Sequence, residues 1–76
     1  MTAVQKWYRR KDGTTVFKSG RYKVLEIHLR PGKFYCCFVF DRGRVISGNG
    51  YHSAALKTLG KAMKWGIRKA KELNII

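Results

Sequence analysis

The first residues that could carry chemistry stand in one short run near the N-terminus. Trp7 and Tyr8 are followed at once by Arg9, Arg10 and Lys11. Arginine and lysine neutralise phosphates, and an indole or phenol ring can stack on a nucleobase. This run therefore predicts a nucleic-acid contact, with packing of either ring against a neighbouring strand as the alternative.

A second basic region has helical spacing near the C-terminus. Its cations recur every three or four residues and are Lys57, Lys61, Lys64, Arg68 and Lys71. Glu72 is the only acidic residue after position 50, so ion pairs one helical turn apart do not neutralise this face. We expect a face that contacts phosphates or a partner, with a solvated helix face as the alternative.

Lys18 and Arg21 follow the aromatic run and complete the predicted interface. The predicted nucleic-acid-binding residues are Trp7, Tyr8, Arg9, Arg10, Lys11, Lys18, Arg21, Lys57, Lys61, Lys64 and Arg68. A glycine-rich turn at 48–53 could also bind phosphate through backbone N–H groups. Its spacing matches neither a Walker loop nor a dinucleotide fingerprint, so a turn with a helix cap is the preferred interpretation.

Residues for catalysis or metal binding are sparse. His28 and His52 are the only histidines, and the four acidic residues form no legible carboxylate pair or nucleophile–base pair. Together with Cys36 and Cys37, the two histidines give four possible zinc ligands, but their spacing follows no known zinc pattern. We expect a protein that is not an enzyme and holds no metal or cofactor; a small basic ribonuclease is the enzymatic alternative.

The charge balance also indicates a protein that binds an anionic partner. Seventeen lysines and arginines stand against four acidic residues in 76, which gives a net charge of +13 and an isoelectric point near 10.4. Self-repulsion at this charge opposes compaction, so a polyanionic partner is expected. Nucleic acid is the first candidate, an acidic protein the second and an anionic membrane the third. The sequence does not distinguish DNA from RNA, single strands from duplex, or a monomer from a homodimer.

The compartment follows from two observations. No apolar leader follows Met1, and the longest apolar run, 34–40, is too short to cross a bilayer. Cys36 and Cys37 are adjacent, and neighbours on a strand point to opposite faces, so no disulfide framework is expected. We therefore expect a cytoplasmic protein, in the nucleoid or in a host cell, without membrane contact.

Alternating residues separated by turn pairs predict an antiparallel sheet over 1–48. The turn pairs are Asp12-Gly13, Pro31-Gly32 and Arg42-Gly43, and the expected strands are 4–11, 14–18, 22–30, 33–41 and 44–47. A two-residue loop at Pro31-Gly32 would place one apolar face under the helix, comprising Leu25, Ile27, Phe34, Cys36, Phe38 and Phe40. The Arg42-Gly43 hairpin is left open between a two-residue loop and a bulge, which decides whether Val45 or Ile46 enters the core.

A long amphipathic helix is expected over 52–73, capped by Ser53 or, alternatively, by Asn49 or His52. Its apolar stripe is Leu56, Leu59, Met63, Ile67 and Ala70. Two glycines, at 60 and 66, would let the helix lie close against the phenylalanines, with a helix break at position 66 as the alternative. The expected fold is a single α+β domain, 1–76, in which an antiparallel β-meander of four to five strands packs against one long C-terminal helix.

The segment Phe38–Met63 resembles the second half of a double-stranded RNA-binding domain in its strand, turn, strand, Gly-x-Gly and Ser-headed helix. That family opens with a helix that is not expected here, and it carries a lysine cluster where this chain has Ala54-Ala55. Five strands and a terminal helix in a tiny basic protein are also similar in layout to archaeal chromatin proteins. We place the chain in neither family.

The leading hypothesis is a largely sequence-tolerant nucleic-acid-binding protein of the accessory or architectural kind. Its contact surfaces would be the basic, aromatic N-terminal hairpin and the lysine-rich helix face. The alternative is a small phage or mobile-element effector that binds and inhibits an acidic host protein of the nucleic-acid-processing or transcription machinery.

Overall fold

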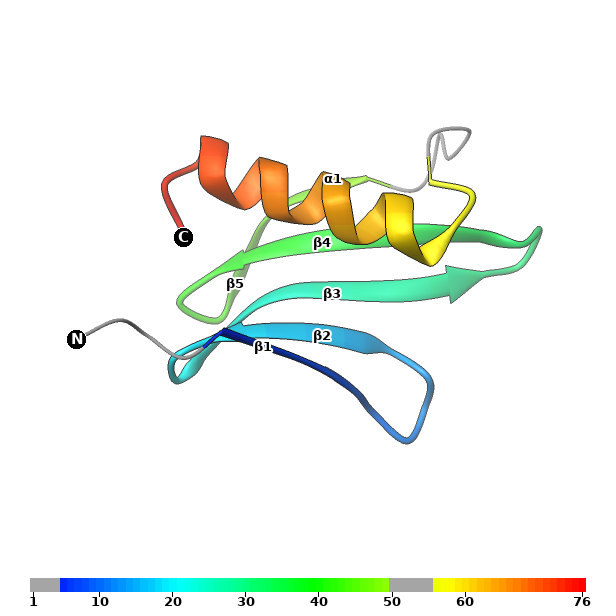
Figure 1. The fold of residues 1–76 in the computed structure, drawn as a ribbon, viewed down its shortest axis with the longest axis horizontal. Helices are drawn as coiled ribbons and strands as arrows, with labels where there is room; N and C mark the ends of the chain where they lie inside the picture. Colours follow the sequence, from blue (N-terminus) through cyan, green and yellow to red (C-terminus); the bar gives the residue numbers. More distant parts are fainter. Residues whose placement is uncertain (1–4, 50–55) are drawn as a thin grey trace.

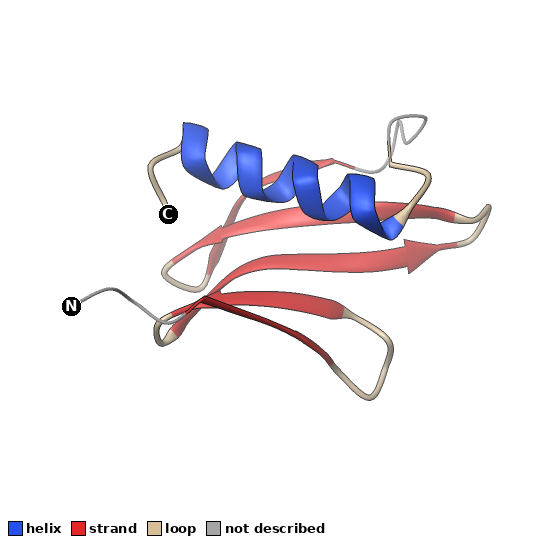
Figure 2. Cartoon of the chain, in the orientation of Figure 1, coloured by secondary structure: helices blue, strands red, loops and turns tan. Residues whose placement is uncertain are grey.

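A computed structural model describes residues 5–49 and 56–76. Five antiparallel strands form one sheet in chain order, and a single helix covers one face of it (Figures 1 and 2). The strands are β1 (Gln5–Arg9), β2 (Thr15–Ser19), β3 (Tyr22–Arg30), β4 (Phe34–Asp41) and β5 (Arg44–Asn49), and the helix is α1 (Leu59–Glu72). The predicted α+β meander with a C-terminal helix is confirmed.

The turn pairs form because their residues accept the backbone conformation that a tight hairpin needs. Asp12 accepts a hydrogen bond on Oδ1 from the backbone N–H of Thr14 at 2.9 Å, and Gly13 has a φ of +91°. Arg42 and Gly43 both have positive φ, at 51° and 86°, which matches the right-handed twist of the strands they join.

The predicted register of the β3–β4 hairpin is wrong by one residue. Arg30 pairs with Phe34, so the loop contains Lys33 as well as the Pro-Gly pair, and Lys33 has a positive φ of 61°. A one-residue slip moves every β4 side chain to the other face. The residues of β4 that pack toward α1 are therefore Tyr35, Cys37 and Val39, whereas Phe34, Cys36, Phe38 and Phe40 face away from it.

Two β-bulges shift the pairing again. Val24 is the extra residue opposite the step from Phe17 to Lys18, and Ile46 is the extra residue in β5. The last hairpin thus has both a two-residue loop and a bulge. Neither candidate enters the core, because Val45 is 57 % exposed and Ile46 is 46 % exposed.

The helix begins at Leu59, later than the predicted start at position 52. Thr58 is its N-cap and accepts a hydrogen bond on Oγ1 from the backbone N–H of Lys61 at 3.1 Å. Just upstream, the carbonyl of Leu56 accepts a hydrogen bond from the N–H of Tyr35, which ties this segment to β4. Of the predicted caps, Asn49 ends β5, while Ser53 and His52 lie outside the described residues.

The helix packs on the sheet through its smallest residues. Ala62, Gly66 and Ala70 are buried in successive turns, and a Cβ on Gly66 would lie 2.8 Å from the Sγ of Cys37 and from a methyl group of Leu25. The expectation that a glycine permits close packing is confirmed for position 66, although against Leu25 and Cys37 and not against phenylalanines. Gly60 has open space around it, so its predicted packing role is wrong.

Because the small residues occupy the centre of the contact, the larger apolar residues of the predicted stripe lie to its side. Leu59, Met63 and Ile67 are only partly buried and flank the core. α1 packs mainly on β3 and β4, so the outer β1–β2 hairpin extends beyond its cover (Figure 1). This offset leaves a concave surface beside α1.

Candidate nucleic-acid interface

Strand alternation divides the N-terminal aromatic and basic run between the two faces of the sheet. Trp7 lies on the helix side, paired with Phe17, and their ring centroids are 4.8 Å apart in an edge-to-face arrangement. Arg9 is on the same side as Trp7, whereas Tyr8 and Arg10 belong to the opposite side, here called the open face. The run therefore cannot act as one contact surface.

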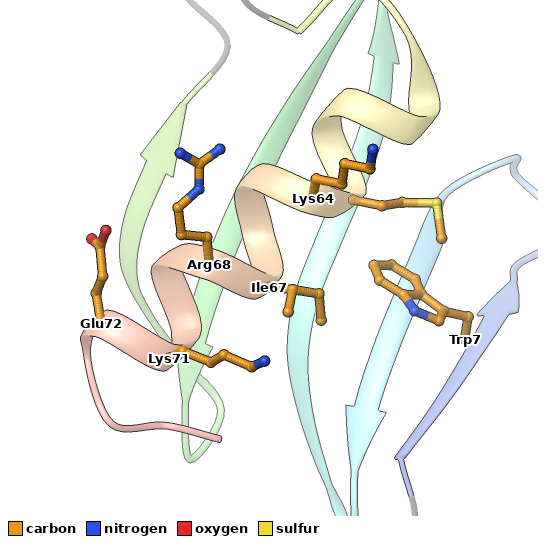
Figure 3. Close-up of a pocket in the computed structure, with 7 residues that line it drawn as sticks. Trp7, Lys64, Ile67, Arg68, Lys71 and Glu72 are labelled. Atoms are coloured by element: carbon orange, nitrogen blue, oxygen red, sulfur yellow. The ribbon is translucent and has the colours of Figure 1, made fainter.

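Trp7 forms one wall of a groove of about 530 Å³ beside α1, here called the Trp7 groove. Its lining residues are Trp7, Met63, Lys64, Ile67, Arg68, Lys71 and Glu72. Figure 3 shows the indole facing the side of the helix that carries Ile67. Since Met63 and Ile67 are left incompletely covered by the sheet, the groove has an apolar floor.

Cations of α1 surround this apolar floor. Lys64 and Lys71 lie toward its two ends in Figure 3, two helical turns or about 10 Å apart along the axis. Arg68 also contributes to the lining, but its side chain points away from Trp7 in Figure 3. Glu72 is the one acidic residue of the lining, and its carboxylate lies 3.7 Å from the ammonium group of Lys69. The groove thus combines an indole, aliphatic side chains and a basic rim.

The remaining predicted site residues lie apart from the Trp7 groove. Lys57 precedes the helix and Lys61 belongs to its first turn, and both are exposed. Lys11 is in the β1–β2 loop, and Arg21 is in the β2–β3 turn. The structure therefore brings together Trp7, Lys64 and Arg68 from the predicted set and distributes the others over the surface.

A row of lysines crosses three strands on the open face. Lys6 pairs directly with Lys18, and Lys18 pairs directly with Lys23. Like charges placed opposite one another destabilise a sheet. The ammonium group of Lys23 also lies 4.3 Å from the ring centroid of Phe40, in cation–π contact. This row is a second candidate surface for a polyanion.

The centre of the open face holds a buried carboxylate with three basic partners. Glu26 accepts hydrogen bonds from Lys23 and, at 3.3 Å, from Arg10. Its other oxygen lies 2.9 Å from Nε2 of His28, so this nitrogen must carry a proton. Nδ1 of the same ring lies 3.5 Å from the hydroxyl oxygen of Thr14.

The balance of forces on Glu26 fixes its charge. Burial raises the pKa of its carboxyl, but the hydrogen bonds from Lys23 and His28, with the nearby charge of Arg10, lower it more. The resulting pKa lies below the ordinary value of 4.5. Glu26 is therefore ionised at neutral pH and holds the basic side chains around it in place.

Most of the positive charge has no acidic partner. Three of the seventeen lysines and arginines form ion pairs within the protein, namely Arg10, Lys23 and Lys69, which leaves fourteen without one. All seventeen cations and all four acidic residues belong to the described ranges, 5–49 and 56–76. The excess charge is thus available to an external anion.

The predicted nucleic-acid-binding set lacks three residues of these surfaces, Lys6, Lys23 and Lys71, of which Lys71 does belong to the predicted basic helix face. Lys71 lies seven residues after Lys64, and this heptad spacing indicates a shared helix side. Counting outward from a two-residue Asp-Gly loop would pair Lys6 with Ser19, whereas the observed loop also contains Lys11 and shifts Lys6 to a position opposite Lys18. The side of the sheet on which Lys23 lies could not be predicted, because the bulge at Val24 moves Lys23 to the opposite side.

Within the described part of the chain, no three histidine, cysteine, aspartate or glutamate side chains lie close enough to hold a metal ion together. In the same residues, no helix has the length and apolar character needed to span a membrane.

Comparisons with protein-family models, with curated proteins and with solved structures found no match. The function is therefore inferred from the side chains of this chain and their arrangement.

Proposed function

We propose that this protein binds nucleic acid electrostatically and with little sequence preference, without acting as an enzyme. The observation that carries the proposal is the set of fourteen cations that have no acidic partner in a domain of 76 residues. A surface of this kind attracts a polyanion by releasing the counterions condensed on it.

Sequence tolerance is supported by the kind and placement of the cations. Ten of the seventeen are lysines, which attract phosphate as flexible point charges and do not form the planar fork by which arginine recognises guanine. The basic side chains are spread over the helix, the hairpin turns and the open face. Such a distribution suits contacts to a backbone more than readout of base edges.

A binding role is also favoured by the state of the Glu26–His28 pair. Both oxygens of Glu26 contact basic groups, and both ring nitrogens of His28 have a polar neighbour. Because Nε2 carries a proton, Nδ1 of His28 keeps a lone pair, but this lone pair faces the hydroxyl of Thr14, a residue that is only 5 % exposed and so out of reach of a phosphodiester. The pair is therefore better suited to fixing Arg10 and Lys23 than to cleaving a phosphodiester.

Fluorescence anisotropy with labelled single-stranded DNA, duplex DNA and single-stranded RNA tests the proposal. We expect binding to each type at low salt, little change when the base sequence is scrambled, and weaker binding at higher salt. Absence of binding to all three at low salt would contradict the proposal.

A pull-down from lysate, with and without nuclease treatment, separates this function from the alternative of an effector that binds an acidic protein. We expect nuclease to remove the captured material. An acidic protein that stays bound in stoichiometric amount after nuclease treatment, together with no binding to purified nucleic acid, would replace the proposal with the effector function.

A further inference from the structure

We propose that the Trp7 groove binds an unpaired nucleotide, so that the protein prefers single strands over duplex; this inference rests on the proposed function. The base would lie against the indole of Trp7 over the apolar floor. The phosphates on either side of it would contact the cations at the two ends of the groove. The ligand class is single-stranded DNA or RNA.

The floor of the groove has the chemistry that a nucleobase requires. Trp7 contacts Phe17 edge-to-face, which fixes the indole on the edge strand β1. Met63 and Ile67 present the aliphatic groups of the floor beside it. Every base has an apolar π-face, so stacking on one indole adds affinity without selecting a sequence. The volume of about 530 Å³ is that of a small-molecule site and admits a nucleotide.

The rim has the charge that flanking phosphates require. Lys64 and Lys71 stand on the helix at positions related by seven residues, on the same side of α1 as Ile67 (Figure 3). Neither lysine has an acidic partner among the described residues, and the only carboxylate of the lining, Glu72, pairs with Lys69. Two free ammonium groups therefore bracket an apolar, aromatic surface.

The geometry discriminates against duplex. In a double helix the faces of the bases are covered by their neighbours, and only the edges are presented in the grooves. The indole lies between α1 and β1 and is only partly exposed, so it does not protrude far enough to enter a base step. A flexible single strand can lay one base into the groove, whereas a duplex can use only the surrounding cations.

Intrinsic fluorescence of Trp7 tests this inference directly. Because Trp65 also emits, the measurement uses a Trp65→Phe background, in which the indole of Trp7 is the only one. The probes are a poly(dT) oligonucleotide and a hairpin duplex with the same number of phosphates. We expect poly(dT) to quench the emission in proportion to saturation, and the duplex to leave it nearly unchanged.

Matched variants separate stacking from packing. Trp7→Phe keeps an aromatic ring, and Trp7→Leu keeps an apolar side chain but cannot stack. We expect Trp7→Leu to weaken poly(dT) binding about fivefold or more and Trp7→Phe to weaken it less, while duplex affinity is the same in all three proteins. Thermal unfolding of each variant shows whether the fold is retained.

Three outcomes would overturn the inference. They are an unchanged poly(dT) affinity in a folded Trp7→Leu protein, equal losses for poly(dT) and duplex, and equal quenching by both probes. Each leaves the proposed function in place, since the protein would still bind nucleic acid through its cations. If neither probe binds at low salt, the proposed function and this inference are both contradicted.

Discussion

The two faces of the sheet differ in how they are stabilised. The helix side is apolar: Leu25, Ile27, Cys37 and Val39 are almost fully buried beneath α1. The open face carries a buried carboxylate, Glu26, surrounded by basic groups. Folding energy therefore comes mainly from the helix side, and the open face has enough polar character to remain in water without a cover.

The two regions also differ in whether a substitution can change ligand binding without changing the stability of the fold. On the open face, the lysine row and the Glu26 cluster share Lys23, so changes to its charge also alter the stability of the sheet. In the Trp7 groove, Lys64 and Lys71 project from an exposed side of the helix and make no ion pair in the protein. The groove can therefore change its affinity for a ligand with little effect on the fold.

The largest expected effect is a loss of unfolding free energy, which we compare for one apolar residue on each face. Leu25→Ala should cost about 2–5 kcal/mol of unfolding free energy, because the side chain is fully buried under the helix. Phe38→Ala should cost about 1–2 kcal/mol, because its ring is partly exposed on the open face and removes less area from water. Urea unfolding of both variants measures the difference. A larger loss for Phe38→Ala than for Leu25→Ala would restore the register first expected from the sequence.

The two helix glycines, Gly60 and Gly66, provide a matched test of how closely α1 packs on the covered face. A Cβ at Gly66 would collide with Cys37 and Leu25, so Gly66→Ala should destabilise the protein by about 1–3 kcal/mol as α1 is pushed outward. Gly60→Ala meets open space and should be neutral or stabilise by up to about 1 kcal/mol through helix propensity. Melting temperatures that move in the same direction for both variants would contradict this packing.

On the open face, acid should weaken the Glu26 cluster. The folded pKa of Glu26 is lowered, so its stabilising contribution is complete above the ordinary value of 4.5 and is lost as the pH falls from there through the folded pKa. Glu26→Gln should lower stability at pH 7 by about 1–3 kcal/mol, because Lys23 and Arg10 lose a charged acceptor.

Urea unfolding of both proteins from pH 7 to pH 3 measures this contribution. The pKa of Asp12 is also lowered, by hydrogen bonds from Thr14, so Asp12→Asn serves as the control for the same pH range. A Glu26→Gln protein whose stability falls with acid as steeply as that of the wild type would show that Glu26 is not the group responsible.

The smallest expected effect compares equal charge changes on the two faces. Lys64→Gln with Lys71→Gln should weaken binding of single-stranded DNA about tenfold or less, and more than Lys6→Gln with Lys18→Gln does. The second pair should also raise stability slightly, because two opposed lysines no longer repel. Anisotropy at one fixed salt concentration checks both. A greater loss for the open-face pair would move the main interface to the lysine row.

The strand number and the turn positions were predictable because turn chemistry is local. Asp12-Gly13 and Arg42-Gly43 have the residues that tight hairpins favour, and the structure uses them as expected. The register was not predictable, since the sequence does not indicate that Lys33 adopts a positive φ and lengthens the Pro-Gly loop by one residue. That one residue exchanges the two faces of β4.

The candidate site was predictable only in composition. The sequence indicates that Trp7 and the helix cations suit nucleic acid, but it treats Trp7, Tyr8 and Arg9 as one cluster, which strand alternation then divides. The meeting of Trp7 with Lys64 and Lys71 depends on the lateral offset of α1, which is set by the packing of its small residues on β3 and β4. No local pattern encodes that offset.

Electrostatic binding of nucleic acid is best tested by the salt dependence of affinity. If about five phosphates are neutralised, the logarithm of the association constant should fall against the logarithm of salt concentration with a slope of about −3 to −4 on single strands and about −4 to −5 on duplex DNA. We expect slopes in these ranges for the unmodified protein. Affinity that stays constant as salt is raised would contradict electrostatic binding.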